Sequence, residues 1–246
     1  MRKSSSESKD PLGLQTLQLF ASVPEFNKWL FQSVSPFCSG NILETGSGIG
    51  NISQCLLSHF EKISLSDLRE EYCEILKQKF GAYQNLQGIY SIDLSSPDFE
   101  KSYSRLINKF DTVIALNVIE HIYDDSLAII NCKKLLTRQG QLIILVPAYQ
   151  NLYNSLDNML KHYRRYNKNR LENLLQGQGM NLIHARYFNF AGIFGWWFTG
   201  NVLKSKVIPG YLLKIFNKLI PLSRILDRLI FYRSGLSVIV IAQNNN

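Results

Sequence analysis

A carboxylate, Glu44, ends a short apolar run and is followed at once by glycines at three alternate positions. Glycine has no Cβ and tolerates positive φ, so such a turn can hold a ligand against bare backbone. The spacing is not the dinucleotide fingerprint G-x-G-x-x-G, because Asn51 stands where its third glycine would be. We expect a small-molecule site at this turn, formed by Glu44, Thr45, Gly46, Ser47, Gly48 and Gly50.

Two further acids follow short apolar segments farther along the chain. Asp67 comes after segment 63–66, about 20 residues beyond the turn, where a carboxylate can accept both ribose hydroxyls of a nucleoside. The alternative is that Asp67 caps the helix expected over Leu68–Phe80, and the two roles are compatible. Asp93 follows segment 88–92 in the same way.

The clearest strand is the near-continuous apolar run Phe110–Leu116, as expected for a parallel strand covered on both faces. It leads into Asn117–Ile122, a helical pattern over Asp124–Leu136 and a further apolar run, Gly140–Pro147. Apolar runs thus alternate with helical patterns, which predicts βαβ units. In open sheets of this kind ligands bind beyond the carboxyl ends of the strands. The polar residues named above all fall at such ends.

Two motifs resemble those of the class I S-adenosylmethionine (SAM)-dependent methyltransferases: the acid before the glycine turn, and the run D-x-V-x-x-x-x-V-x-E-H from Asp111 to His121. The resemblance covers residues 38–190 and the last strand. It implies an α/β fold, a Rossmann-like three-layer sandwich whose seven-stranded sheet is mostly parallel with strand seven antiparallel. It also implies that SAM is the cofactor and S-adenosylhomocysteine the product. Asp93 is similar to the family's adenine contact, although a plain loop aspartate is an alternative. The implied cofactor contacts are Glu44, Thr45, Gly46, Ser47, Gly48, Gly50, Asp67, Leu68, Asp93, Leu94, Asn117, Val118 and His121.

The loop 148–166, after the fifth strand, is dense in aromatic and charged residues. Its V-P-A and H-Y-R-R-Y elements resemble a subgroup of bacterial type 11/12 methyltransferases associated with glycosyltransferase or polyprenyl-linked pathways. That resemblance places the loop on the acceptor side, although Lys161 stands where those relatives usually have glycine. The alternative is that Arg164 and Arg165 are surface charges leading into a helix over Asn167–Gln176. The expected acceptor contacts are Tyr149, Tyr153, Asp157, Tyr163, Arg164, Arg165 and Tyr166, with Trp196 and Trp197 from the following segment.

Segment 190–234 separates the last two expected strands, Asn181–Phe188 and Leu236–Ala242. It mixes Lys and Arg with aromatic residues, and its second half predicts two short amphipathic helices, 211–220 and 223–232. Interleaved cations and apolar faces favour either an interfacial helix on an anionic membrane or a lid over an apolar acceptor. The alternative is plain packing on the core.

Charge is divided unevenly along the 246 residues. Residues 161–246 carry 13 Lys and Arg against only Glu172 and Asp227, which favours an anionic partner. No apolar stretch reaches about 18 residues, so no transmembrane helix is expected. The four cysteines form no C-x-x-C pair and are expected to be buried fillers in a reducing cytoplasm. We expect a disordered segment 1–10 and a single domain over 11–246, in the cytoplasm or peripheral on the inner membrane face.

Methyl transfer from SAM is an in-line displacement that needs alignment of the reactants rather than a metal. An oxygen acceptor benefits from a base. His162 is the first candidate because it lies in the acceptor loop and histidine titrates near neutral pH, and His121 is the second. In related families E-x-x-E-H supplies metal ligands, but Asn117 replaces the first glutamate, so we expect no metal.

We therefore predict methylation, at an oxygen, of a small-molecule or lipid-linked acceptor that is anionic or glycolipid-like. One alternative is an RNA methyltransferase, which the basic half of the chain permits, although no RNA-binding module is recognisable and nucleic acid is not the expected partner. Another is a non-catalytic partner subunit with a SAM-binding fold, against which the intact glycine turn argues.

Overall fold

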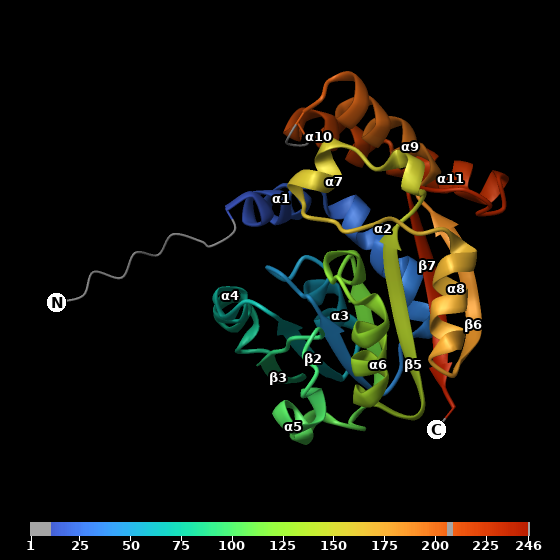
Figure 1. Ribbon diagram of the computed structural model, residues 1–246. Helices are drawn as coiled ribbons and strands as arrows, with labels where there is room; N and C mark the ends of the chain where they lie inside the picture. The colour runs from blue at the N-terminus through green and yellow to red at the C-terminus, as the bar shows by residue number, and fades with distance from the viewer. Residues whose placement is uncertain (1–10, 206–208, 246) are drawn as a thin grey trace.

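One seven-stranded sheet forms the centre of the molecule, in the order β3-β2-β1-β4-β5-β7-β6 (Figure 1). The structure, a computed structural model, describes residues 11–205 and 209–245, so the segment predicted to be disordered lies outside them. Neighbouring strands run parallel except at β7, which is antiparallel to both β5 and β6. The predicted Rossmann-like sheet is confirmed. Its strands are β1 (Asn41–Thr45), β2 (Lys62–Asp67), β3 (Leu86–Ser91), β4 (Phe110–Leu116), β5 (Leu136–Pro147), β6 (Met180–Phe188) and β7 (Ser237–Asn244).

Helices cover both faces of the sheet and complete three layers. One apolar core lies between the sheet and α5, α6 and α8, and the other lies between the sheet and α2, α3 and α4. Because β4 and the second half of β5 are covered on both sides, residues 113–116 and 142–146 are apolar at every position, as expected for buried parallel strands. These helices are α2 (Pro24–Val34), α3 (Ser53–His59), α4 (Glu70–Phe80), α5 (Phe99–Ser102), α6 (Asp125–Leu135) and α8 (Lys168–Gly177).

Two of the helices begin where the sequence places a capping side chain. Asp124 accepts a hydrogen bond of 2.9 Å from the backbone N–H of Leu127 and caps α6. Asn167 accepts one of 2.8 Å from the N–H of Arg170 and caps α8. Such caps satisfy amides that have no partner inside the helix. The predicted helices therefore start one residue later than the patterns suggested.

A further layer of helices lies beyond the carboxyl ends of the parallel strands (Figure 1). The segment inserted between β6 and β7 supplies most of it, and we call its helices α9, α10 and α11 the helical cap. Helix α1 contacts α10 and α2, and the short α7 contacts the π-helical turn that follows α9. The elements of this layer are α1 (Pro11–Ala21), α7 (Ser155–Met159), α9 (Phe190–Trp197), the π-helical turn Phe198–Val202, α10 (Gly210–Lys218) and α11 (Ile220–Leu229).

The two amphipathic helices predicted in the insertion form as α10 and α11. Pro221 does not separate them, because it lies in the first turn of α11, where its missing N–H has no intrahelical role. Over the described ranges, none of the helices has the length and apolar character needed to cross a bilayer. Short 3-10 turns complete the chain at Ser35–Phe37, Ser104–Leu106, Ile119–His121 and Gln150–Leu152.

Candidate cofactor and acceptor site

The glycine turn between β1 and α3 adopts a conformation that suits glycine. Gly46 and Gly48 have φ angles of 65° and 56°, in the left-handed region. A Cβ on Gly46 would clash with the side chain of Val118, which follows β4. The backbone N–H of Ser47 donates to the carbonyl of Ser66 over 2.8 Å and ties the turn to β2. Bare backbone therefore lies at the ends of β1 and β4, where the strand order switches.

Asp67 lies at the end of β2 beside the turn, and we call the region bounded by the glycine turn, Asp67 and the end of β4 the cofactor crevice. Oδ2 of Asp67 accepts a 2.9 Å hydrogen bond from the N–H of Gly48, and its Oδ1 accepts one of 3.0 Å from the N–H of Arg69. Burial raises the pKa of Asp67, although these amides and the Arg69 charge pull it down. The alternative role as a helix cap is wrong, because α4 begins at Glu70 and Arg69 is its N-cap residue.

Glu44 lies beneath the turn rather than at its surface. It is 4% exposed and accepts a short hydrogen bond from the hydroxyl of Ser53 at the start of α3. Burial raises its pKa to about 7, against the opposing effect of hydrogen bonds from Ser53 and Ser47. The structure thus gives Glu44 a role in fixing the turn between strand and helix, and a direct contact with the cofactor stays a prediction.

The remaining predicted cofactor residues surround the crevice in different ways. Leu68 is 60% exposed at the end of β2, where an apolar surface can cover an adenine ring. Asp93 accepts from the N–H and the hydroxyl of Ser95, at 2.8 and 2.6 Å, so one of its oxygens is engaged within its own loop. The side chain of Leu94 is buried in the core, which leaves only its backbone for a ligand. Asn117 is exposed and has a φ of 54° at the end of β4.

Helix α1 lies over the glycine turn, which the sequence patterns did not predict. A Cβ on Gly48 would stand 3.0 Å from Cδ1 of Leu17. Asn51 donates from Nδ2 to the carbonyl of Leu17 over 2.9 Å. The signal for this contact was present in Asn51, which replaces a glycine of the dinucleotide fingerprint and instead ties α1 to the turn.

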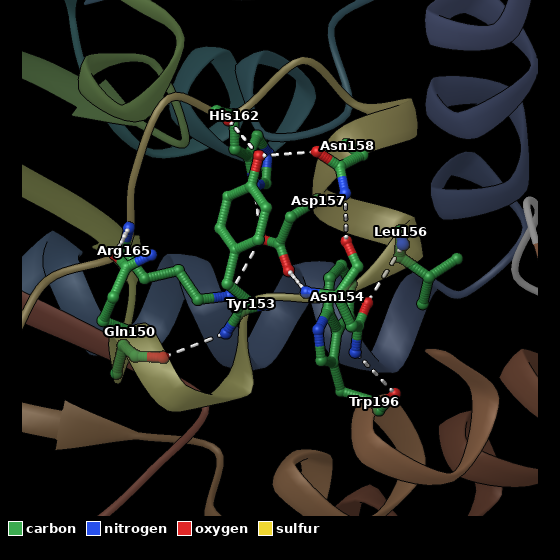
Figure 2. Close-up of polar contacts among 10 residues, drawn as sticks. Gln150, Tyr153, Asn154, Leu156, Asp157, Asn158, His162, Arg165 and Trp196 are labelled. Atoms are coloured by element: carbon green, nitrogen blue, oxygen red, sulfur yellow. Dashed lines mark hydrogen bonds and ion pairs between the residues drawn. The ribbon is translucent and has the colours of Figure 1, made fainter. Parts of the chain in front are cut away.

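His162 sits in a buried polar network beside the crevice (Figure 2). Its Nδ1 lies 2.8 Å from Oδ1 of Asp157, and Arg165 donates from Nε to the same oxygen over 2.8 Å. The hydroxyl of Tyr153 donates to the backbone carbonyl of His162 over 2.7 Å. Burial alone would raise the pKa of Asp157, but the hydrogen bond from His162 and the charge of Arg165 hold it below its usual value. A permanently ionised Asp157 therefore orients the imidazole.

Glu120 and His121 join this network to the cofactor crevice. The rings of His121 and His162 meet edge to face with centroids 4.7 Å apart. Glu120 is fully buried, and neither carboxylate oxygen has a hydrogen-bond partner among the described residues. Burial raises its pKa to about 7, although the charges of His162 and Arg165 oppose this. Near neutral pH this carboxyl can therefore hold or release a proton.

Glu120, His121 and His162 also offer the donor atoms of a metal site. One such atom from each residue lies within 4.8 Å of the other two. Neighbouring ligands of an ion bound at about 2.1 Å stand about 3 Å apart, so these side chains would have to close around a cation. The group could hold a metal, and the absence of one stays a prediction.

Residues 43–142 match the sequence profile of a family described as a methyltransferase domain. This stretch runs from β1 into β5 and contains the glycine turn, Asp67 and the Glu120–His121 pair. Residues 43–142 are thus similar to a methyltransferase domain, and the chain has the fold of a solved SAM-dependent methyltransferase.

Solved structures share the fold of this methyltransferase. A SAM-dependent methyltransferase from Archaeoglobus fulgidus matches with a TM-score of 0.58 and 17% identity, covering 89% of this chain and 94% of that chain. Phosphoethanolamine N-methyltransferase 2 from Haemonchus contortus, in complex with SAM, matches with a TM-score of 0.60 and 17% identity, covering 94% of this chain and 57% of that one. At such identities the likeness establishes the fold and leaves the acceptor open.

Among the curated relatives are proteins named as polyketide synthases. A protein of Dictyostelium discoideum named probable polyketide synthase 42 is 28% identical over 149 residues, which is 50% of this chain. The chain spans only 5% of the length of that relative. The matched region is thus one small part of a much larger protein.

Three residues of the loop 148–166 that were predicted to contact the acceptor are instead engaged within the protein. Arg165 is 1% exposed and is already bonded to Asp157 and to the carbonyl of Ala148, so it cannot grip an anionic acceptor. Arg164 pairs with Asp125 over 2.8 Å, and the buried hydroxyl of Tyr166 donates to the same carboxylate over 2.9 Å. These three residues therefore stabilise the conformation of the loop. The alternative of free surface charges is equally wrong.

Of the other predicted acceptor residues, Asp157 is fully buried and already bonded to His162 and Arg165, whereas the aromatic side chains differ in their exposure. Tyr163 and Trp197 are exposed at 55% and 49%. Trp196 covers the guanidinium of Arg165, whose Cζ is 4.7 Å from the indole ring, so it forms the roof of the network. Tyr149 stacks on Tyr187 and donates to Ser234, at the base of the helical cap.

The backbone conformation of Lys161 accounts for the glycine that related sequences usually have at this position. Its φ is 61°, in the left-handed region where L-residues are strained and glycine is not. The next residue, His162, donates its backbone N–H to the carbonyl of Asp157 over 2.9 Å. The positive φ therefore turns the chain so that His162 folds back onto Asp157, and Lys161 achieves this at some cost in strain.

Proposed function

We propose that this methyltransferase transfers the methyl group of SAM to an oxygen of a lipid-linked acceptor with an anionic or glycosyl head. The glycine turn and Asp67 support a cofactor site, because Gly46 and Gly48 take positive φ and leave bare backbone at the strand ends, with Asp67 buried beside them. SAM supplies a methyl group that its positive sulfur has already activated. The protein therefore has to align the acceptor and remove its proton.

The observation that carries the proposal is the pair of His162 and Asp157 beside the crevice. Asp157 accepts from Nδ1, which leaves the second ring nitrogen of His162 to take a proton from an acceptor hydroxyl. The ring of His121 and the carboxyl of Glu120 lie close to His162. Glu120, with a pKa raised to about 7 by burial, can pass the proton onward.

The helical cap supports a lipid tail on the acceptor. Large apolar side chains of the cap and its connecting segments remain exposed: Phe194, Trp197, Phe198, Val202, Leu203, Tyr211, Ile215, Leu219, Leu222, Ile225, Leu229 and Phe231. Cations are interleaved among them, including Lys214 and Lys218 of α10. An apolar face bordered by lysine and arginine suits the interface of an anionic membrane. The polyketide synthase relative further favours an organic acceptor over a nucleic acid.

The test is a transfer assay with methyl-labelled SAM against three fractions of a cell extract: membrane lipids, soluble small molecules and RNA. We expect label in the lipid fraction, with the methylated oxygen located by mass spectrometry. Asp67→Ala serves as the control because it removes a cofactor contact without touching the cap. Label confined to RNA or to soluble compounds would refute the lipid-linked acceptor, and salt-sensitive labelling of RNA would favour the RNA alternative.

A further inference from the structure

Three arginines line one small cavity on the side of the molecule away from the glycine turn. The cavity has a volume of about 150 Å³ and lies between α2, the C-terminal half of β6 and α11. None of its residues belongs to the cofactor turn or to the network around His162. The lining consists of Trp29, Gln32, Ser33, Arg186, Arg224, Arg228 and Tyr232.

Arg186 is fixed in this cavity with unused hydrogen-bonding capacity. Its guanidinium lies over the ring of Tyr232, with Cζ 4.4 Å from the centroid, and Nη2 donates to the carbonyl of Ser33 over 3.4 Å. Its Nε is buried and has no hydrogen-bond partner among the described residues. A buried N–H of a charged group without a partner is costly. An acceptor oxygen entering the cavity would remove that cost.

The positive charge of the cavity is not balanced by a carboxylate. No acidic residue lines it. Asp227 lies near Arg186, but its two oxygens accept from the N–H groups of Asn189 and Phe190, at 2.7 and 2.8 Å. Within the described ranges, the three lining arginines form no ion pair. Three mutually repelling guanidinium groups around one cavity favour an anion that can accept from several N–H groups at once.

The position of the cavity on α11 indicates where that anion comes from. Arg224 and Arg228 are one helical turn apart and lie on the same side of α11. The neighbouring face exposes Leu222, Ile225 and Leu229, at 54%, 51% and 66%. The arginines therefore border an apolar stripe, between that stripe and the body of the protein. If the stripe enters the acyl region of a membrane, the cavity lies at the depth of the headgroups.

We propose that this arginine cavity binds the phosphate group of an anionic membrane lipid and so orients the helical cap on the membrane. Phosphate suits the site because its oxygens match the fork of a guanidinium, and three such forks converge here. The inference rests on the membrane contact in the proposed function and is independent of methyl transfer. Free phosphate shares the same chemistry, so the experiment must separate the two sources.

The test measures binding of the full chain to phosphatidylcholine vesicles that contain either phosphatidic acid or a fatty acid, at equal surface charge. We expect about tenfold tighter binding to the phosphatidic acid vesicles, from at least one additional charge-assisted hydrogen bond. The double variant Arg224→Gln/Arg228→Gln should lose this preference. The charge-matched control Lys214→Gln/Lys218→Gln, on α10, should keep it. SAM affinity, measured on both variants, should equal that of the unchanged protein and so report correct folding.

Three outcomes would overturn the inference. Equal losses in both double variants, or no preference for phosphatidic acid in the unchanged protein, would leave only diffuse electrostatic attraction. Calorimetric binding of inorganic phosphate that is lost in Arg224→Gln/Arg228→Gln, without a preference for phosphatidic acid, would assign the cavity to free phosphate instead of lipid. Because neither measurement needs turnover, failure of the acceptor assignment would leave the result for the cavity intact.

Discussion

The cofactor crevice and the helical cap have contrasting surfaces, one polar and hydrogen-bonded and the other apolar and exposed. The crevice is built from backbone and from acids such as Asp67, whose oxygens both accept hydrogen bonds. The cap instead leaves side chains such as Leu229 and Phe231 exposed, at 66% and 76%. Rigid strand ends can bind a ligand that is the same in every relative. An acceptor that varies between relatives requires an element whose sequence can change without disturbing the sheet.

The acceptor loop connects these two regions and belongs fully to neither. Residues 155–159 form α7 against the π-helical turn that follows α9, while His162 reaches back to His121 beside the crevice. The proposed base is thus placed at the boundary, on a loop made rigid by Asp157 and Arg165. Mutations can separate the contributions of crevice, loop and cap.

Replacing the proposed base should have the largest effect on turnover. We expect His162→Gln to lower kcat by about 100- to 10,000-fold, the usual contribution of general acid–base catalysis, while the SAM dissociation constant stays unchanged. His59→Gln is the matched control, because His59 is exposed on α3 and bonded only to the carbonyl of Cys55 within its own helix. Normal turnover in His162→Gln would move proton removal to another group, with His121 the next candidate.

The buried carboxyl of Glu120 should make the free energy of unfolding depend on pH. Its pKa is raised from 4.5 to about 7, so the folded state holds a proton that the unfolded state releases between these values. Stability should therefore fall as pH rises through this window, by roughly 3 kcal/mol for a shift of this size. Glu120→Gln should remove that loss, and the gain over the unchanged protein should be seen by denaturant unfolding at pH 8 but not at pH 4. Glu44, Asp67 and Asp227, whose pKa values are also raised by burial, contribute further slope in the same direction. Parallel stability curves for the two proteins would contradict the assignment.

Within the crevice, replacing Asp67 is the most direct test of the cofactor assignment. We expect Asp67→Ala to weaken SAM binding by about 1.5–3 kcal/mol, the value of hydrogen bonds to a charged group. Calorimetric titration measures the change directly. Thr112→Ala offers a control, since Thr112 is buried at the opposite end of β4 and bonds to Ser39. Unchanged SAM affinity in Asp67→Ala would remove this residue from the site.

The difference between crevice and cap also explains which features the sequence could predict. Strand ends follow from alternating apolar runs, so Asp67, Asn117 and the glycine turn fell where expected. The burial of Arg165 and Tyr166 was not foreseen, because their partners Asp157 and Asp125 meet them only through tertiary packing. Local patterns carry no information on whether a long charged side chain points outward or inward, since desolvation and pairing decide that in three dimensions.

The same limit applies to α1 and to Glu120. Leu17 packs over Gly48 across a long stretch of sequence, and no periodicity within Pro11–Ala21 indicates that target. Glu120 was expected as part of a loop motif, yet it is fully buried. The motif contains Glu120, but its raised pKa arises from the burial that the fold imposes on it.

Variants of the cap should leave the crevice untouched. We expect Ile225→Ser/Leu229→Ser to weaken binding to anionic vesicles by about tenfold or more, because each side chain loses apolar area that the membrane would cover. SAM affinity should not change. The control Ile183→Ser removes an apolar side chain that is exposed on β6, outside the cap. Equal vesicle binding by the cap variant and the unchanged protein would leave the lid or plain packing as the role of α11.

The smallest expected effect is that of metal removal. The donors of Glu120, His121 and His162 spread over as much as 4.8 Å, and Asn117 stands where a second acid would complete a set for a hard cation. We therefore expect turnover to survive exhaustive chelation and re-addition of Mn²⁺ to change nothing. Turnover lost on chelation and restored by Mn²⁺, together with stoichiometric Mn²⁺ binding that Glu120→Gln abolishes, would convert the proton-accepting network into a metal centre. In that case His162 would act as a ligand and not as a base, and the loss of activity in His162→Gln would have to be attributed to the lost ion.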